Sequence, residues 1–90
     1  MIAFRSVVAD IRLASRKGTE GIWQMSLDQT SFKPGDTGIL QAETRSGTRL
    51  TIPVTAVVLD EDGVLWHIVE KPLAAGTDVT GRVSSGVRVS

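Results

Sequence analysis

The chain has 90 residues, with ten basic and ten acidic side chains, one histidine and no cysteine. A chain of this length holds one hydrophobic core, so the sequence predicts a single β domain over residues 1–90. The lack of cysteine excludes disulfides and cysteine zinc sites, and the balanced charge argues against broad binding to a phosphate backbone. Without an apolar run long enough to cross a membrane or a signal-peptide pattern at the N-terminus, we expect a cytoplasmic or assembly-borne protein.

Apolar and polar residues alternate with a period of two through most of the chain, the pattern of half-buried β-strands. A bulge is predicted near Val7, because apolar residues before and after it lie on opposite parities. Trp23 and Met25 alternate with polar residues in the second strand, and residues 50–58 alternate with few exceptions. Pro53 has no N–H to give to a ladder, so it indicates an edge position or an outward-facing site at the start of the strand. The predicted strands are residues 2–14, 21–28, 37–45, 49–59, 64–70 and 77–89.

Turn-forming residues separate these strands. Asp62-Gly63, between two apolar runs, is the strongest hairpin signal of the chain. Because no window supports a long helix, the predicted fold class is all-β. Six short strands in one flat sheet would leave both edges open to aggregation, so we expect a small six-stranded barrel or a barrel-like sandwich.

The apolar parity of each strand predicts the core. His67 falls between Trp66 and Ile68, on the other parity, so we expect it to face outward or lie at the rim. A lone histidine makes neither a conventional zinc site nor, without a partnered nucleophile, a catalytic triad. The predicted core residues are Phe4, Ile11, Leu13, Trp23, Met25, Leu27, Leu40, Ile52, Val54, Val58, Trp66, Ile68, Val79 and Val83.

The two halves of the chain are weakly similar to each other. The alignment sets Val8 against Val54, Trp23 against Trp66 and Gly35 against Gly76. It predicts repeat units at residues 2–47 and 50–86, each a hairpin, a turn and a third strand, related by a pseudo-two-fold axis. The alternative is that small β proteins share turn chemistry by chance.

Charged side chains gather in and near the predicted turns. If the strands alternate in direction, the basic loops share one end of the barrel and the acidic turns gather at the other. Such ends would suit head-to-tail stacking or ring formation, whereas the alternative is ordinary solvated turns. The candidate interaction residues are Arg12, Arg16, Lys17, Arg45, Arg49, Asp60, Glu61 and Asp62.

The sequence predicts no catalytic residue, metal site or cofactor, and we do not expect an enzyme. The acidic turn at residues 60–63 lacks the later ligands of a calcium loop. The glycines match no phosphate-binding motif, and scattered carboxylates with one histidine offer no acid–base pair.

The order of motifs resembles known β proteins. The turn Phe32-Lys-Pro-Gly35, a strand with Ile52-Pro53-Val54 and the hairpin at Asp62-Gly63 are similar to the β-barrel segment of periplasmic adaptor (membrane fusion) proteins, over about residues 4–70. Asp36 stands where that family usually has Met. The resemblance implies a related barrel that packs beside copies of itself, without a transport role.

Two further resemblances concern other stretches. Residues 27–37 resemble the first strand and turn of bacterial immunoglobulin-like modules. The run from Gly47 to Ile52, followed by the hairpin and an apolar strand, is similar in style to small phage head–tail connector proteins.

We therefore expect a non-catalytic structural or interaction module, an oligomeric component of a larger assembly such as a phage virion. Its partners would be copies of itself or another protein of the assembly, and its location cytoplasmic or virion-associated. The alternative is a module that binds a small anion or single-stranded nucleic acid through its basic loops. Few aromatic side chains are free to stack on bases, which argues against nucleic acid.

Overall fold

The computed structural model describes residues 2–18, 20–43 and 46–84, and its regular structure there consists of strands alone. The predicted all-β fold is thus confirmed. Residues 85–89 of the last predicted strand lie outside the described residues. The strands are β1 (Ile2–Lys17), β2 (Glu20–Leu27), β3 (Gly38–Glu43), β4 (Arg49–Val54), β5 (Ala56–Leu59), β6 (Leu65–Val69) and β7 (Asp78–Val83).

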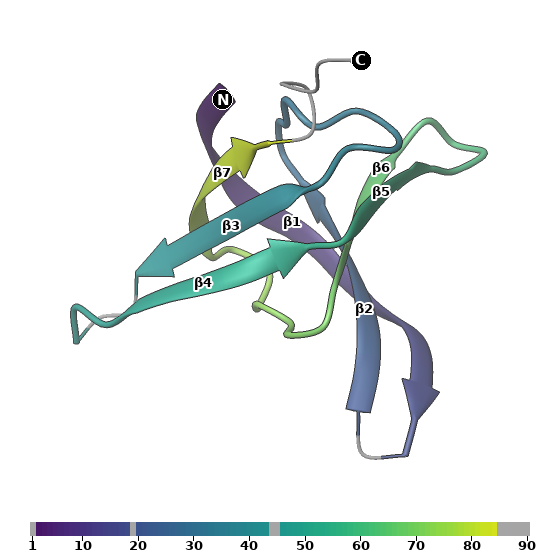
Figure 1. Cartoon of the computed structure of the whole chain (residues 1–90), viewed down its shortest axis with the longest axis horizontal. Coiled ribbons are helices and arrows are strands. Elements are labelled where there is room, and N and C mark those ends of the chain that lie inside the picture. The colour runs from purple at the N-terminus through teal and green to yellow at the C-terminus, as the bar shows by residue number, and fades with distance from the viewer. Residues whose placement is uncertain (1, 19, 44–45, 85–90) are drawn as a thin grey trace.

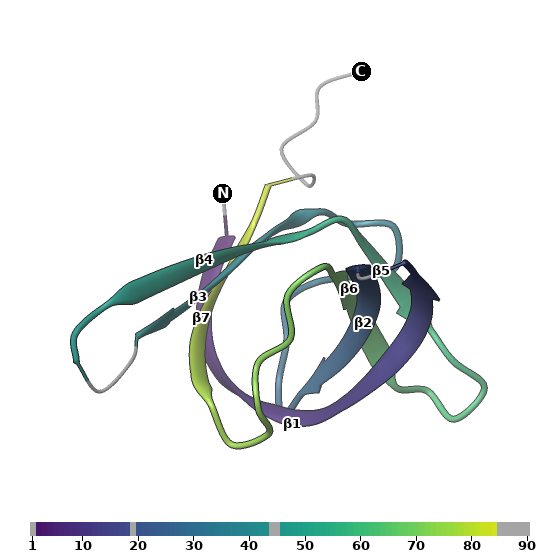
Figure 2. The same ribbon diagram turned by 90° about the horizontal axis from the view of Figure 1, so that it is seen from below.

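The seven strands form one antiparallel sheet in the order β4-β3-β7-β1-β2-β6-β5. The long strand β1 belongs to both halves of the sheet, because residues 2–7 pair with β7 and residues from Val8 onward pair with β2. The end strands β4 and β5 follow one another in the chain, with only Thr55 between them. The sheet therefore curls on itself into a barrel-like sandwich whose ladder is not closed (Figures 1 and 2).

The one strand predicted at residues 49–59 is two strands in the structure. At the break, the Thr55 N–H donates to the carbonyl of Ile68 at 3.0 Å. The break allows β4 to pair with β3 while β5 pairs with β6, which accounts for seven strands rather than six. β4 is an end strand, as Pro53 predicted. The predicted bulge is also present, because the β1–β2 register shifts between Val8 and Asp10.

The core lies between the two halves of the sheet, and its buried cluster includes six of the fourteen predicted core residues, with Phe4, Ile11, Trp23 and Leu27 packed against it. At its centre is Phe32, from the loop between β2 and β3, whose ring meets Phe4 edge-on with centroids 5.7 Å apart. Gly38 and Gly81 leave room for these rings: a Cβ at Gly38 would run into the Arg82 carbonyl and the Phe32 ring, and one at Gly81 into Phe4. The buried cluster is Val8, Met25, Phe32, Leu40, Ala42, Ile52, Val54, Val57, Val69, Leu73, Val79 and Val83.

Two predicted core residues are exposed instead. Leu13 is 43% exposed and Val58 is 41% exposed. Leu13 lies in the hairpin arm of β1 and β2, which extends away from the rest of the molecule (Figure 1). In β5 it is Val57, not Val58, that turns inward, because the chain shifts parity at Thr55.

The face of β6 that turns inward is the opposite of the predicted one. His67 is fully buried, and its neighbours on the same face, Leu65 and Val69, pack in or against the core. Trp66 and Ile68 consequently lie on the outer face and do not belong to the core cluster, although Trp66 is only 5% exposed. The prediction of an outward or rim position for His67 is therefore wrong.

The same backbone contact occurs once in each half of the molecule. The Gly35 N–H donates to the carbonyl of Val57 at 2.9 Å, and the Gly76 N–H donates to that of Val8 at 2.7 Å. These bonds make Val8 the counterpart of Val57 rather than of Val54. The origin of the two halves by duplication stays a prediction.

Candidate functional site

His67 is the one imidazole of the chain and lies inside the barrel. Its Nδ1 is 2.8 Å from the carbonyl oxygen of Met25, and its Nε2 is 2.9 Å from the hydroxyl of Thr30. Phe32 meets the imidazole edge-on, with centroids 5.2 Å apart. The Thr30 oxygen also accepts the N–H of Phe32 at 3.0 Å, so this loop is tied to the histidine.

These partners fix the tautomer of the neutral His67 ring. A carbonyl only accepts, so Nδ1 carries the hydrogen and Nε2 accepts the Thr30 hydroxyl proton. Burial lowers the pKa of His67 below its ordinary value, and the Met25 carbonyl offsets part of that shift. A neutral imidazole with both nitrogens bonded and no exposed surface holds the fold together and has no lone pair left for a ligand.

Arg12 and Asp60, two predicted interaction residues of opposite charge, meet on the outer face at Trp66. The Arg12 guanidinium carbon lies 3.9 Å from the centre of the Trp66 ring, and Arg12 Nε donates to Gln24 at 2.6 Å. The Trp66 Nε1–H donates to Asp60 Oδ2 at 2.8 Å. This bond, with the N–H of Val64 and the nearby Arg12 charge, lowers the pKa of Asp60.

Asp60 thus organises the β5–β6 turn. Its Oδ1 accepts the backbone N–H groups of Asp62 and Val64, each at 2.9 Å. Glu61 and Asp62 are exposed in the same turn. The acidic turn therefore contains one carboxylate that is hydrogen-bonded within the fold, that of Asp60, and two that face solvent.

The basic candidates that the structure describes do not gather at one end of the molecule. Arg16 is exposed in the β1–β2 arm, where Lys17 ends β1, and Arg45 lies outside the described residues. Arg49 begins β4 and is 3.9 Å from the Glu43 carboxylate, with both side chains well exposed. Figure 1 shows the β1–β2 and β3–β4 hairpins pointing in different directions, which differs from the shared basic end that we expected.

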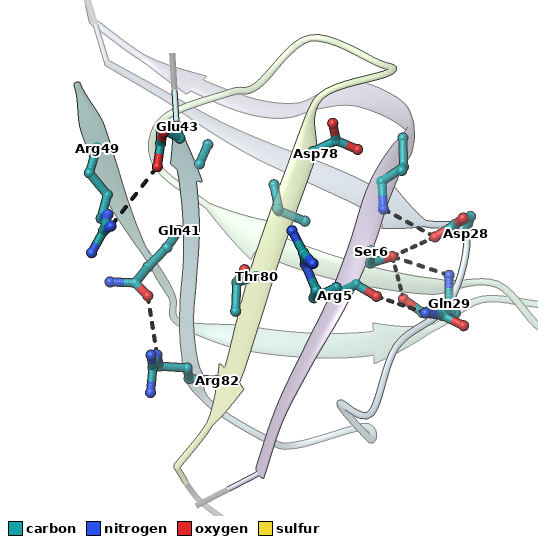
Figure 3. A pocket seen from close by; sticks show the side chains of 13 residues that line it. Arg5, Ser6, Asp28, Gln29, Gln41, Glu43, Arg49, Asp78, Thr80 and Arg82 are labelled. Carbon is teal, nitrogen blue, oxygen red and sulfur yellow. Dashed lines mark hydrogen bonds and ion pairs between the residues drawn. The ribbon is translucent and has the colours of Figure 1, made fainter. Parts of the chain in front are cut away.

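A hollow of about 550 Å³ lies on the outward side of the sheet half formed by β4, β3, β7 and β1 (Figure 3). Its floor includes a row of paired residues, in which Arg5 of β1 faces Thr80 of β7, and Thr80 faces Gln41 of β3. The lining residues are Arg5, Ser6, Val7, Asp28, Gln29, Gln41, Ala42, Glu43, Arg49, Asp78, Val79, Thr80 and Arg82.

Three arginines and three carboxylates line the hollow, so its charges balance. Arg82 Nε donates to Gln41 at 3.1 Å, and Arg49 lies beside Glu43. The Arg5 guanidinium makes no hydrogen bond or ion pair with another described residue, and Figure 3 shows it beside β7, between Asp78 and Thr80. It is the group most available to an anion or a polar partner.

At the side of the hollow, two loop residues cover the outer edge of β1. The Val7 N–H donates to Asp28 Oδ1 at 3.1 Å, and the Asp28 N–H donates to the Val7 carbonyl at 3.0 Å. Gln29 Nε2 donates to the carbonyl of Arg5 at 2.7 Å. The Ser6 hydroxyl, 2.6 Å from Asp28 Oδ1, and then the Val7 N–H lower the pKa of Asp28.

Sequence reasoning found Arg49 of this hollow but missed Arg5, Gln41, Thr80 and Arg82. Their outward parity is legible in the strand pattern, but β1 and β7 are far apart in the chain. Only the strand order places them side by side.

Comparisons with protein-family models, curated proteins and solved structures found no match for this chain. Within residues 2–18, 20–43 and 46–84, no cluster of three or more His, Asp or Glu side chains is placed to hold a metal ion. The same residues include no helix long and apolar enough to cross a membrane.

Proposed function

We propose that this domain is a non-catalytic interaction module that assembles with further copies of itself, or with another protein, as part of a larger assembly. The observation that carries the proposal is the position of its exposed apolar side chains. Leu13 and Leu50 lie on the two hairpin arms, and Val58 and Leu59 lie on the end strand β5, all 41–56% exposed. Apolar residues on arms and sheet ends are suited to contacts between molecules.

The polar chemistry supports the same reading. The buried His67 and the Asp60 carboxylate bond groups of the fold itself, and Arg12 covers a tryptophan ring. An active site requires titratable groups that converge on a substrate, whereas these groups are occupied in holding strands and turns. A phage virion is the setting that the sequence resemblance suggests.

Light scattering at low and high salt tests the proposal. Association through apolar residues and strand edges is expected to survive added salt, whereas association through exposed charges weakens. Replacing Val58 and Leu59 together with Ser is expected to lower the mass of the assembly. The matched control replaces the exposed, polar Glu61 with Ser and should leave that mass unchanged. A strict monomer at every concentration would contradict self-assembly.

A second candidate function is the binding of a small anion, which is favoured because the Arg5 guanidinium has no partner among the described residues. Phosphate is expected to raise the melting temperature of the protein if the hollow binds it, and Arg5→Gln should remove that increase. Arg16→Gln, on a distant arm, is the control. Equal shifts in both variants would show nonspecific binding. A short single-stranded oligonucleotide, followed by fluorescence polarisation at two salt concentrations, tests the nucleic-acid form of this candidate.

A further inference from the structure

The two long stretches of chain, β1 and β4–β5, each present a backbone edge that the sheet leaves unpaired. The Ser84 N–H donates to the Thr37 carbonyl at 3.1 Å, which fixes the alternation of the β3–β7 ladder. Backbone groups of Leu40 and Ala42 in β3 therefore face β4, and they pair there with Ile52 and Leu50. The backbone groups of residues 49, 51 and 53 in β4 consequently point outward, away from the sheet.

The corresponding edge of β1 is covered and the edge of β4 is not. Asp28 hydrogen-bonds the outward N–H and carbonyl of Val7, and the Gln29 side chain donates to the outward carbonyl of Arg5. The outward backbone groups of Arg49, Thr51 and Pro53 make no hydrogen bond to any other described residue. Among the described residues, β4 is thus an exposed edge with the hollow beside it (Figure 3). An edge of this kind is a template for another strand.

We infer that the β4 edge pairs with the β4 edge of a second copy of this chain, antiparallel, with Thr51 opposite Thr51 of the second copy. This inference rests on the proposed self-association and names one surface that takes part in it, beside the exposed apolar residues of β5. In this register the two Thr51 residues exchange N–H···O bonds. Each Arg49 N–H also meets the Pro53 carbonyl of the other copy. Pro53 lacks only the N–H, so it weakens this pairing without blocking it.

Side chains on the two faces of β4 agree with this register. Leu50, 42% exposed on the inward-facing side of the arm, comes opposite Ile52 of the second copy and loses its contact with water. On the other face Arg49 comes opposite the uncharged Pro53. The two Arg49 positions are four residues apart along the paired strands, about 13 Å, so like charges do not meet.

Cysteine crosslinking tests the register directly, because the chain has no cysteine of its own. Directly paired residues of this kind have Cα atoms about 5.5 Å apart, within the range that a disulfide spans. Under mild oxidation Thr51→Cys is expected to form a covalent dimer. Thr80→Cys is the matched control, because Thr80 faces the same side from β7, with β3 between it and the edge. It should remain largely uncrosslinked.

A second variant probes the hydrogen bonds. Thr51→Pro removes an N–H that makes no bond to another described residue, so the fold should survive while the dimer dissociates at least about tenfold more readily. A wild-type dimer that Thr51→Cys does not crosslink and Thr51→Pro does not weaken would overturn this inference and leave the proposed function standing. A wild-type monomer would overturn both this inference and the proposed self-assembly, and would leave assembly with another protein as the proposed function.

Discussion

Acidification is expected to destabilise the fold through His67. The imidazole is fully buried between Met25, Thr30 and Phe32, and it accepts the Thr30 hydroxyl proton at Nε2. Protonation of Nε2 turns an acceptor into a donor and places a charge in the core, where none of the described carboxylates bonds the ring. The unfolded chain takes up that proton freely.

The sign and size of the effect follow from this difference. Because the pKa of His67 in the folded state is lowered from its ordinary 6.5, its contribution to stability is complete above that pH. It is lost as the pH falls from about 6.5 towards the folded-state pKa. Within this window the free energy of unfolding is expected to fall by up to about 1.4 kcal/mol per pH unit, the value for one proton.

Urea unfolding followed by tryptophan fluorescence at pH values from 7.5 to 5 measures this slope. His67 is the one histidine of the chain, so no other histidine contributes. The lowered pKa values of Asp28 and Asp60 act in a separate window, below their ordinary 3.8. His67→Gln should remove the slope between pH 7 and pH 5. A free energy of unfolding of the wild-type protein that is constant over this range would refute the reasoning. This outcome can be read from the wild type alone, even if His67→Gln does not fold.

Three further predictions concern single contacts. Gly38→Ala should lower the free energy of unfolding by about 3 kcal/mol in urea titrations, because the added Cβ runs into a backbone carbonyl of β7; an unchanged midpoint would show that the strands are not so close. Arg12→Ala should cost about 0.5–1 kcal/mol by removing the cation over Trp66, and should shift the fluorescence of that ring; identical spectra would count against the contact. Asp28→Ala should uncover the β1 edge, so that the Val7 amide exchanges its hydrogen faster by NMR, whereas unchanged protection would disprove the cap.

Local sequence features were sufficient to predict the fold class, the hairpin at Asp62-Gly63, the bulge in β1 and the edge position of Pro53. Each of these depends on neighbours in the chain. The break at Thr55 was harder to predict, because a continuous alternating strand and a strand that changes partners have similar sequences. The apolar run Ala56, Val57 and Val58 fits either parity.

The composition of β6 explains why the predicted outward face of His67 was wrong. Both parities of this strand are apolar apart from the histidine, so composition favoured Trp66 and Ile68 as the inward pair. Which face of β6 turns toward the core depends instead on partners that are distant in the chain. Thr30 and Met25 supply both hydrogen bonds that a buried imidazole requires, while Arg12 and Asp60 cover Trp66 from outside.

The candidate site could be predicted only in part, for a similar reason. Charged turns can be recognised in a sequence, and they gave Arg49 and the Asp60 turn. Arg5 and Arg82 lie within strands, where a charged residue indicates an outward face and nothing more. That both line one hollow follows from the pairing of β1 with β7, which no local pattern predicts.

The most direct test of self-assembly is sedimentation equilibrium of the wild-type chain over a wide range of concentration, at low and high salt. We expect a mass that rises from the 9.6 kDa of one chain to that of a dimer or a larger assembly, with little effect of salt. A mass that stays at one chain under all of these conditions would contradict self-assembly.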